Sequence, residues 1–209
     1  MSFVTSRRRL TLAAAAVIAA VAATAGPAMA GGTATGCPDA SVSQPFASWG
    51  DGADYQLAPH GDVEDGAESW SLEGGARAVE GNEPFMASGS SDHLSLRLPG
   101  SSSATTQRMC IGPEHPSFRF FAKRSGGSAE GHLMVEVVFD GEHGRQHSLP
   151  VGRVSPSGDW APSQSLPTVV DKLAAARGTG VNASFRFAPQ GGGVWSVDDV
   201  FVDPFRGIR

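Results

Sequence analysis

The sequence predicts an all-β fold, an antiparallel β-sandwich with one short helix, and three observations lead to it. Residues 93–98 alternate strictly, which places three leucines on one face, and residues 184–187 do the same with two phenylalanines. Clusters of glycine, serine and proline interrupt such stretches at short intervals. Strand patterns almost never alternate with helix patterns. Together these features favour short antiparallel strands in two packed sheets.

The first 30 residues predict a signal peptide that is cleaved after Ala30. A basic stretch at residues 6–10 is followed by an apolar run over residues 10–25 and by the small residues Ala28 and Ala30 around Met29. The apolar run is shorter than the ~20 residues that span a bilayer. We therefore expect a secreted protein without a membrane span, exported by the Sec or the twin-arginine route.

The mature chain is acidic and long enough for one domain. Loss of Arg7, Arg8 and Arg9 lowers the 16 basic residues to 13, against 21 acidic residues, and so gives a formal charge of −8. This charge makes nucleic acid an unsuitable partner. Residues 31–36 are small and predict a disordered tail, and residues 37–209 predict a single domain.

Cys37 and Cys110 are the only cysteines, and in an exported protein they predict one disulfide. The bond closes a loop of about 70 residues, which in the chain-entropy model stabilises the fold by about 4 kcal/mol. A reactive thiol or a metal-bound cysteine pair would need a nearby histidine or closely spaced cysteines, and the sequence has neither feature. The pair therefore predicts a disulfide with a structural role.

Two further segments complete the expected elements. Residues 133–139 are almost continuously apolar and predict a central strand with little solvent on either face. Residues 169–177 are rich in helix-forming residues, and Gly178 is placed to end a helix. We therefore expect one short crossover helix at this point.

Two short motifs resemble the ends of a known domain family. Residues 61–66, read as GDVEDG and followed by Trp70, are similar to the opening N-G-D-F-E-x-G…W of carbohydrate-binding modules with the galactose-binding-like jelly-roll fold. Residues 195–200, read as WSVDDV, resemble the closing Y-I-D-D-V strand of these modules. The chain also resembles uncharacterised exported actinobacterial proteins that share these ends. The resemblance implies a jelly roll, often with a structural Ca²⁺ that joins the first strand to the last.

The resemblance also implies the calcium ligands. Glu64 matches the acid of the opening motif, and the Gly61 carbonyl lies in the same turn as Glu64. Asp198 matches the acid of the closing motif, and Asp199 is the second choice for this position. Such a set of hard oxygens suits Ca²⁺. The alternative is that the two aspartates cap a bulge or accept bonds from backbone amides. His60 and Val63 depart from the asparagine and phenylalanine of the family pattern.

Sugar binding needs exposed aromatic rings. Trp70 and Trp195 are expected in the core, and Trp49 is expected to anchor the N-terminal segment. Trp160 and Tyr55 are therefore the candidate ligand-binding residues, although Trp160 could equally pin a loop onto the sandwich.

No catalytic constellation is present: the sequence has no nucleophile elbow or zinc-binding helix motif, and its six histidines are scattered. Two hypotheses follow. The first is a secreted non-catalytic module that binds carbohydrate or another cell-envelope component. The second is a secreted structural or protein-interaction jelly-roll domain without a sugar site.

Overall fold

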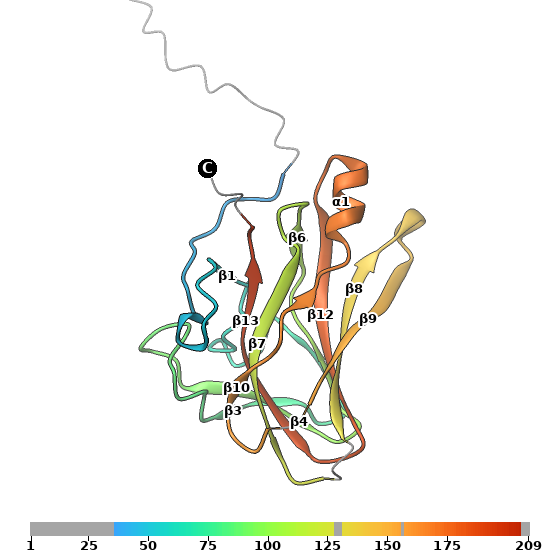
Figure 1. Cartoon of the computed structure of the whole chain (residues 1–209). Coiled ribbons are helices and arrows are strands. Elements are labelled where there is room, and N and C mark those ends of the chain that lie inside the picture. Colours follow the sequence, from blue (N-terminus) through green and yellow to red (C-terminus); the bar gives the residue numbers. More distant parts are fainter. Residues whose placement is uncertain (1–35, 128–130, 156, 206–209) are drawn as a thin grey trace, which may run out of the picture. The chain divides into compact units, whose positions relative to one another are not determined.

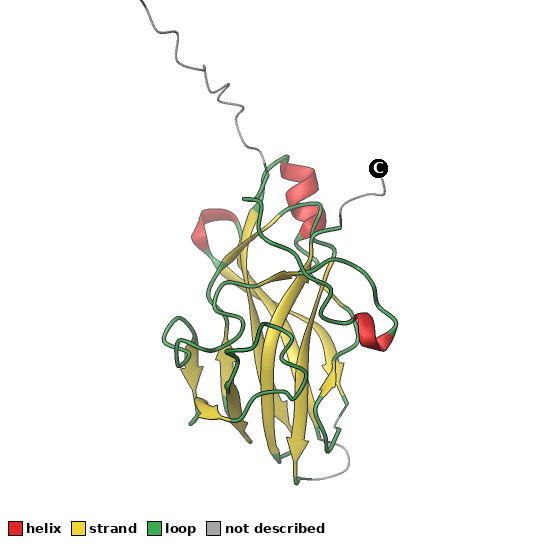
Figure 2. Ribbon diagram, turned by 90° about the vertical axis from the view of Figure 1, so that its left-hand side faces the viewer, coloured by secondary structure: helices red, strands yellow, loops and turns green. Residues whose placement is uncertain are grey.

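The computed structural model describes residues 36–127, 131–155 and 157–205, which all belong to one compact unit. The predicted signal peptide, residues 1–30, and residues 31–35 of the predicted tail lie outside the described residues. Among the helices of the described part, none is long and apolar enough to cross a membrane. The described domain consists mainly of strands and loops, with short helical turns at its periphery (Figure 2).

Two antiparallel sheets build the domain. The seven-stranded sheet has the order β10-β7-β13-β4-β3, with β1 paired to β13 and β11 to β7. The six-stranded sheet has the order β2-β5-β12-β8-β9, with β6 paired to β12. Figure 1 shows β7 and β13 side by side in one layer and β12, β8 and β9 in the other. The prediction of an antiparallel sandwich is confirmed.

The strand bounds of the seven-stranded sheet are β1 Gln56–Leu57, β3 Arg77–Glu80, β4 Leu94–Pro99, β7 Ser117–Ser125, β10 Ala161–Pro162, β11 Leu166–Pro167 and β13 Val194–Asp203. Those of the six-stranded sheet are β2 Ser71–Glu73, β5 Ser103–Thr105, β6 Met109–Ile111, β8 His132–Asp140, β9 Gln146–Val154 and β12 Val181–Gln190. The predicted strand at residues 133–139 is β8, which pairs on both sides, with β12 and with β9.

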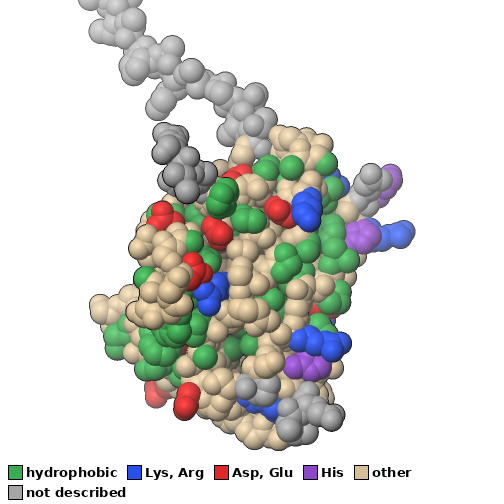
Figure 3. Space-filling view, in the orientation of Figure 1, with side chains coloured by type: hydrophobic (Ala, Val, Ile, Leu, Met, Phe, Trp, Pro, Cys, Tyr) green, Lys and Arg blue, Asp and Glu red, His purple; other side chains and the backbone are tan. Residues whose placement is uncertain are grey.

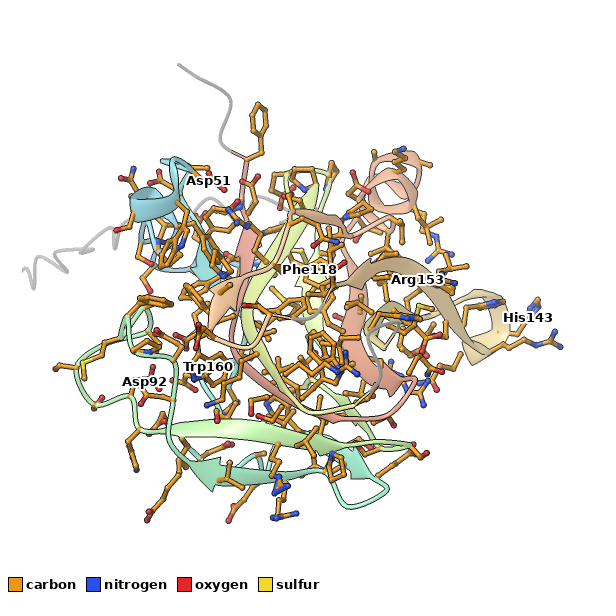
Figure 4. The ribbon with its side chains drawn as sticks, turned by 60° about the horizontal axis from the view of Figure 1, so that its bottom comes forward. Asp51, Asp92, Phe118, His143, Arg153 and Trp160 are labelled. Atoms are coloured by element: carbon orange, nitrogen blue, oxygen red, sulfur yellow. A yellow bond between two sulfur atoms is a disulfide. The ribbon has the colours of Figure 1, made fainter. Side chains whose placement is uncertain are left out.

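The main core fills the space between the sheets. Phe118 of β7 stacks on Phe185 of β12 with ring centroids 4.0 Å apart, and Phe120 meets Phe187 edge to face at 4.8 Å. These four rings are fully buried. Figure 4 shows Phe118 at the centre of the domain, between the layers. The alternation of apolar residues along the strands therefore sets which side chains face the other sheet.

The single α-helix matches the predicted crossover helix. Helix α1 spans Asp171–Arg177, two residues shorter at its start than predicted, and buries Ala174 against the main core. Gly178 ends it in the left-handed conformation, with its N–H bonded to carbonyls of the last turn. Two single-turn 3₁₀ helices complete the elements, η1 Ala47–Trp49 and η2 Glu142–Gly144.

The outer faces of the two sheets differ. A second aromatic cluster lies on the outer face of the seven-stranded sheet, where Phe46 and Tyr55 of the N-terminal segment pack on Phe121 of β7 and Phe201 of β13. Residues 41–57 therefore cover this face. On the six-stranded sheet, the outward side chains of β12, β8 and β9 include the partly exposed Arg186 and carry no such layer among the described residues.

The predicted disulfide between Cys37 and Cys110 is present, and its two Cα atoms are 5.4 Å apart. It joins the start of the covering N-terminal segment to β6 of the six-stranded sheet. Gly180 lies against the bond, because a Cβ at this position would come within 2.8 Å of the Cys37 sulfur. The staple therefore links the covering segment to the opposite sheet.

Candidate functional site

The opening turn and the last strand are neighbours. The Ala58 N–H donates to the Val200 carbonyl at 2.8 Å, and the Val200 N–H donates to the Gly61 carbonyl at 3.1 Å. A Cβ at Gly61 would lie only 2.8 Å from the Val200 oxygen, so this approach requires glycine. The Gly61 carbonyl, one of the expected calcium ligands, thus accepts a hydrogen bond from the backbone of β13.

A bulge in β13 buries two consecutive carboxylates. The pairing of β13 with β7 shifts register between Asp198 and Phe201, and Asp199 has a positive φ of 50°. Regular alternation would place Asp198 and Asp199 on opposite faces, but both side chains are fully buried. Asp198 Oδ1 accepts a hydrogen bond from the Asp199 N–H at 3.0 Å. The bulge expected as an alternative to metal binding is therefore present.

Two further acids join these aspartates to form what we call the acidic cluster: Glu83, Asp92, Asp198 and Asp199. Glu83 and Asp92 come from the loop between β3 and β4 and are 0% and 5% exposed. Carboxylate oxygens of Glu83, Asp92 and Asp199 lie within 4.8 Å of one another. The Glu83 N–H donates to Asp198 Oδ2 at 3.1 Å. Figure 4 shows Asp92 on this loop, at one edge of the domain.

The electrostatics of the acidic cluster disfavour free, charged carboxylates. Burial, together with the charges of Asp199 and Asp92, raises the pKa of Asp198 to about 10. Burial and the charge of Asp92 raise the pKa of Asp199 to about 8, and burial raises the pKa of Asp92 to about 6. Buried carboxylates so close together must either bind protons or share a cation.

Several oxygens of the acidic cluster have no donor. Asp92 Oδ1, Asp92 Oδ2 and Asp199 Oδ1 are buried without a hydrogen-bond partner of acceptable geometry among the described residues. The Asn82 amide lies beside Asp92 and lowers its pKa, although Asn82 Nδ2 is itself buried without a hydrogen-bond partner in the described part of the chain. Unsatisfied buried carboxylate oxygens are costly. Hard oxygens of this kind are the ligands that Ca²⁺ prefers, so the residues fit a calcium ion.

Glu64 lies at the margin of the acidic cluster. Its Oε1 accepts hydrogen bonds from the N–H groups of His93 and Leu94 at 2.9 and 2.6 Å. Burial would raise its pKa, but these N–H groups outweigh burial and hold the pKa of Glu64 below the usual value. The side chain interacts with Asp92 of the cluster. Glu64 therefore ties the opening turn to the start of β4.

Sequence reasoning found only part of this constellation. It identified Asp198 and Asp199 as acids of the last strand, of which at least one should be buried, and missed Glu83 and Asp92. These two acids lie in an irregular loop, where no periodic pattern indicates which side chains are buried. Their one sequence signal is that Glu83 lies near the start of this loop and Asp92 near its end.

Neither expected sugar-binding ring is freely exposed. Tyr55 is only 2% exposed, and its hydroxyl donates to Asp51 Oδ2 at 2.8 Å. The interpretation of Tyr55 as an exposed platform is therefore wrong, because its ring fills the second aromatic cluster. Trp160 is partly buried against the same cluster, and Lys123 Nζ lies 4.8 Å from its ring centroid. Figure 4 shows Trp160 lying inward of the loop that carries Asp92.

The exposed aromatic rings lie elsewhere. Trp49 and Phe85 are 39% and 44% exposed, and their rings meet edge to face with centroids 4.6 Å apart. Met86, beside Phe85, is 54% exposed. We call these three residues the aromatic ledge. Trp49 does contact Phe121 of the sheet, as expected of an anchor, yet much of its ring remains in solvent. In Figure 3, hydrophobic side chains gather on the left-hand side, over the η1 segment and the loop before β4.

A polar groove crosses the outer face of the six-stranded sheet. It has a volume of about 350 Å³ and is lined by Ser71, Glu73, Thr105, Val138, Gln146, Ser148 and Arg186. We call it the sheet groove. Arg186 Nη1 donates to Glu136 at 2.7 Å, and its Nη2 donates to the Ser103 hydroxyl at 3.2 Å. The lining contains hydroxyl, amide, carboxylate and guanidinium groups, and no aromatic ring.

Comparison with solved structures identifies the fold. No family model matches the sequence, and no curated protein matches it. The structure is similar to the CBM22-1 and GH10 modules of Clostridium thermocellum endo-1,4-beta-D-xylanase 10B in complex with xylohexaose, with a TM-score of 0.52 and 16% identity. That match covers 72% of this chain and 29% of the xylanase chain, so this chain spans less than a third of that protein's length.

Two structures from Paenibacillus barcinonensis Xyn10C give the same result. Its CBM22-1 xylan-binding domain has a TM-score of 0.52 at 14% identity, covering 75% of this chain and 97% of that one. Its CBM22-1–CBM22-2 tandem has a TM-score of 0.50 at 13% identity, covering 72% and 45%. At these identities the likeness establishes the fold. This protein has the jelly-roll sandwich found in carbohydrate-binding modules, as its two end motifs predict.

Proposed function

We propose that this protein is a secreted, non-catalytic carbohydrate-binding module that binds its glycan in the sheet groove. The groove is the observation that carries the proposal, because it presents several hydrogen-bonding groups on one open surface. Sugar hydroxyls both donate and accept, so they suit a lining of serine, glutamate and arginine. The structural neighbours that bind xylan and xylohexaose share the fold, which supports a carbohydrate partner.

Arg186 is the central residue of the proposed site. Its contacts with Glu136 and Ser103 hold the guanidinium in place, while its side chain remains 36% exposed. Its separation from Glu73 is 3.8 Å, too long for a direct hydrogen bond. A sugar hydroxyl between Arg186 and Glu73 would accept from the first and donate to the second.

A glycan array on the mature domain tests the function, and calorimetric titration with xylohexaose and cellohexaose tests the site. Hydrogen bonds to charged groups contribute about 1.5–3 kcal/mol, so Arg186→Ala should weaken binding at least about tenfold. Arg108→Ala is the matched control, because Arg108 also pairs with a carboxylate, Asp140, but lies outside the groove. A blank array would instead favour the structural or protein-interaction domain.

We also propose that the acidic cluster holds a structural Ca²⁺. Glu83, Asp92 and Asp199 would supply carboxylate oxygens, Asp198 would add charge beside them, and Glu64 would hold the neighbouring backbone. The ion would neutralise the buried charge and join the loop before β4 to the last strand. Titration with CaCl₂ should give one binding site that Asp199→Asn weakens by at least tenfold. If no heat of binding is seen in metal-free protein, calcium is not the ligand.

A further inference from the structure

The aromatic ledge is an unusual surface for a protein of this acidity. Six large hydrophobic side chains are exposed among the described residues. Two of them, Trp49 and Phe85, are in contact, and a third, Met86, follows Phe85 in the chain. Contiguous exposed apolar surface commonly marks a binding site. The ledge lies on the outer side of the seven-stranded sheet, opposite the sheet groove.

The acidic cluster holds the backbone that presents the ledge. The N–H groups of Phe85 and Ala87 both donate to the Glu83 carboxylate, the second at 2.5 Å. The Ser88 N–H donates to Asp199 Oδ2 at 3.1 Å. Between these anchors Met86 has a positive φ of 52°, which turns the chain sharply. The position of the Phe85 ring therefore depends on two buried carboxylates, Glu83 and Asp199.

A small polar hollow is formed by the same two segments that form the ledge. It has a volume of about 220 Å³, and its lining includes the hydroxyl residues Ser41, Ser43 and Ser88. The rest of its lining is apolar and consists of Val42, Leu57, Ala87 and Phe201. This volume is below the ~300–1,000 Å³ of sites for drug-sized ligands. The hollow therefore has room for no more than one small ring, which its three serines could bind through hydroxyl groups.

The dimensions of the ledge favour a sugar over a protein partner. Three partly exposed side chains cover much less than the ~800 Å² per partner that a stable protein interface buries. A sugar ring presents one apolar face of C–H groups and a rim of hydroxyls. The partly exposed rings of Trp49 and Phe85 suit the first, and the serine hydroxyls of the hollow suit the second.

We propose that the aromatic ledge and its neighbouring hollow form a second glycan-binding site, whose geometry depends on a cation in the acidic cluster. The dependence rests on the calcium site proposed above, because the unpartnered oxygens of Asp92 and Asp199 adjoin the Glu83 and Asp199 carboxylates that anchor the loop. The sheet groove lies on the other sheet and has no such connection. The protein therefore has one cation-dependent and one cation-independent sugar site.

The indole N–H signals in ¹H–¹⁵N spectra separate the two sites. The mature domain is titrated with xylohexaose, cellohexaose and β-1,4-galactotriose, first in CaCl₂ and then in EDTA, and the Trp49 signal is assigned with Trp49→Phe. In CaCl₂ at least one of these sugars should shift the Trp49 signal in a saturable way. Phe85→Ala should weaken this binding at least fivefold, whereas Phe205→Ala, the same change at another exposed ring, should leave it unchanged.

Each part of the proposal is contradicted by a different result of this experiment. If none of the three sugars shifts the Trp49 signal in CaCl₂, the ledge is not a glycan site, whatever Arg186-dependent shifts occur in β12. If the Trp49 shift persists unchanged in EDTA, the cation dependence is wrong while the ledge stands. If Arg186→Ala removes the Trp49 shift, the two sites are not independent. The EDTA arm uses unaltered protein, so it decides the cation dependence even if Asp199→Asn does not fold.

Discussion

The outer faces of the two sheets are built in different ways. On the six-stranded sheet the outer face is open, and its polar side chains follow from the alternation of β12, β8 and β5. On the seven-stranded sheet the outer face is covered by residues 41–57 and by the loop before β4, and it contains aromatic rings and buried acids. The comparison teaches that local pattern sets the first face, while contacts between distant segments set the second.

The disulfide should have the largest effect on the covered face, because it fixes the N-terminal segment. Replacing both Cys37 and Cys110 by serine releases a loop of 73 residues, which the chain-entropy model values at about 4 kcal/mol. For a domain of this size, Tm should fall by roughly 8–16 °C. Calorimetry of the mature domain measures the fall, and reduction of the unaltered protein is the control. An unchanged Tm in both would mean that the covering segment holds without its staple.

Calcium should have the next largest effect and should act on the same face. An ion present at a hundred times its Kd stabilises the folded state by about 2.7 kcal/mol, so EDTA should lower Tm by roughly 5–11 °C and CaCl₂ should restore it. Asp199→Asn should remove the difference between the two conditions. Asp140→Asn, at an exposed ion pair with Arg108, is the matched control and should retain it. Identical melting curves in EDTA and CaCl₂ would rule out the ion.

The pH dependence of the free energy of unfolding should test the contact between the covering segment and the loop before β7. His115 is 3% exposed, accepts a hydrogen bond from the Gly112 N–H at 2.9 Å through Nδ1, and pairs with the Gln56 amide at 3.0 Å. Burial lowers its pKa below the unfolded value of 6.5, despite the opposing charge of Glu114. The unfolded chain therefore binds the proton more readily than the folded protein.

Because the folded pKa is the lower one, the neutral His115 ring stabilises the folded state fully above pH 6.5. This stabilisation is lost as the pH falls through the pKa of His115 in the folded protein. Urea unfolding between pH 7.5 and 5 should show a smaller loss of stability in His115→Gln than in the unaltered protein. His147→Gln, at an exposed position of β9, should behave like the unaltered protein. Equal pH slopes in all three proteins would show that His115 does not titrate differently on folding.

The fold could be predicted because its signals are local. Leu96 and Leu98, two positions apart, are both fully buried, as are Phe185 and Phe187, since residues at this spacing share one face of a strand. Gly178 ends the helix because only a residue that tolerates positive φ fits there. The end motifs correctly predicted a jelly roll in which the opening turn meets the last strand at Val200.

The candidate sites could be predicted only in part. Asp198 and Asp199 stood out because acids are unusual within an apolar strand, but the bulge that buries both depends on the backbone of Asp199. The burial of Glu83 depends on a loop folding over the sheet, which no periodicity encodes. The exposure of Tyr55 and Trp49 could not be predicted for the same reason. Both lie in the N-terminal segment outside the regular strands, where Phe46 packs on Tyr55 and covers its ring, while Trp49 stays partly in solvent.

Arg186→Ala should have the smallest effect on stability of these changes. The two faces differ most clearly here, because a residue of the open face should matter for sugar binding more than for folding. Its partners Glu136 and Glu73 lie on the open face, where Arg186 is 36% exposed and a partly exposed ion pair contributes about 0–1 kcal/mol. Arg186→Ala should therefore lower Tm by no more than roughly 4 °C while removing most of the sugar affinity of the sheet groove. Trp49→Phe should leave that affinity unchanged. A large loss of stability in Arg186→Ala would mean that the polar side chains of the open face are needed for folding. A loss of sugar binding in the sheet groove of Trp49→Phe would mean that the two faces do not act separately.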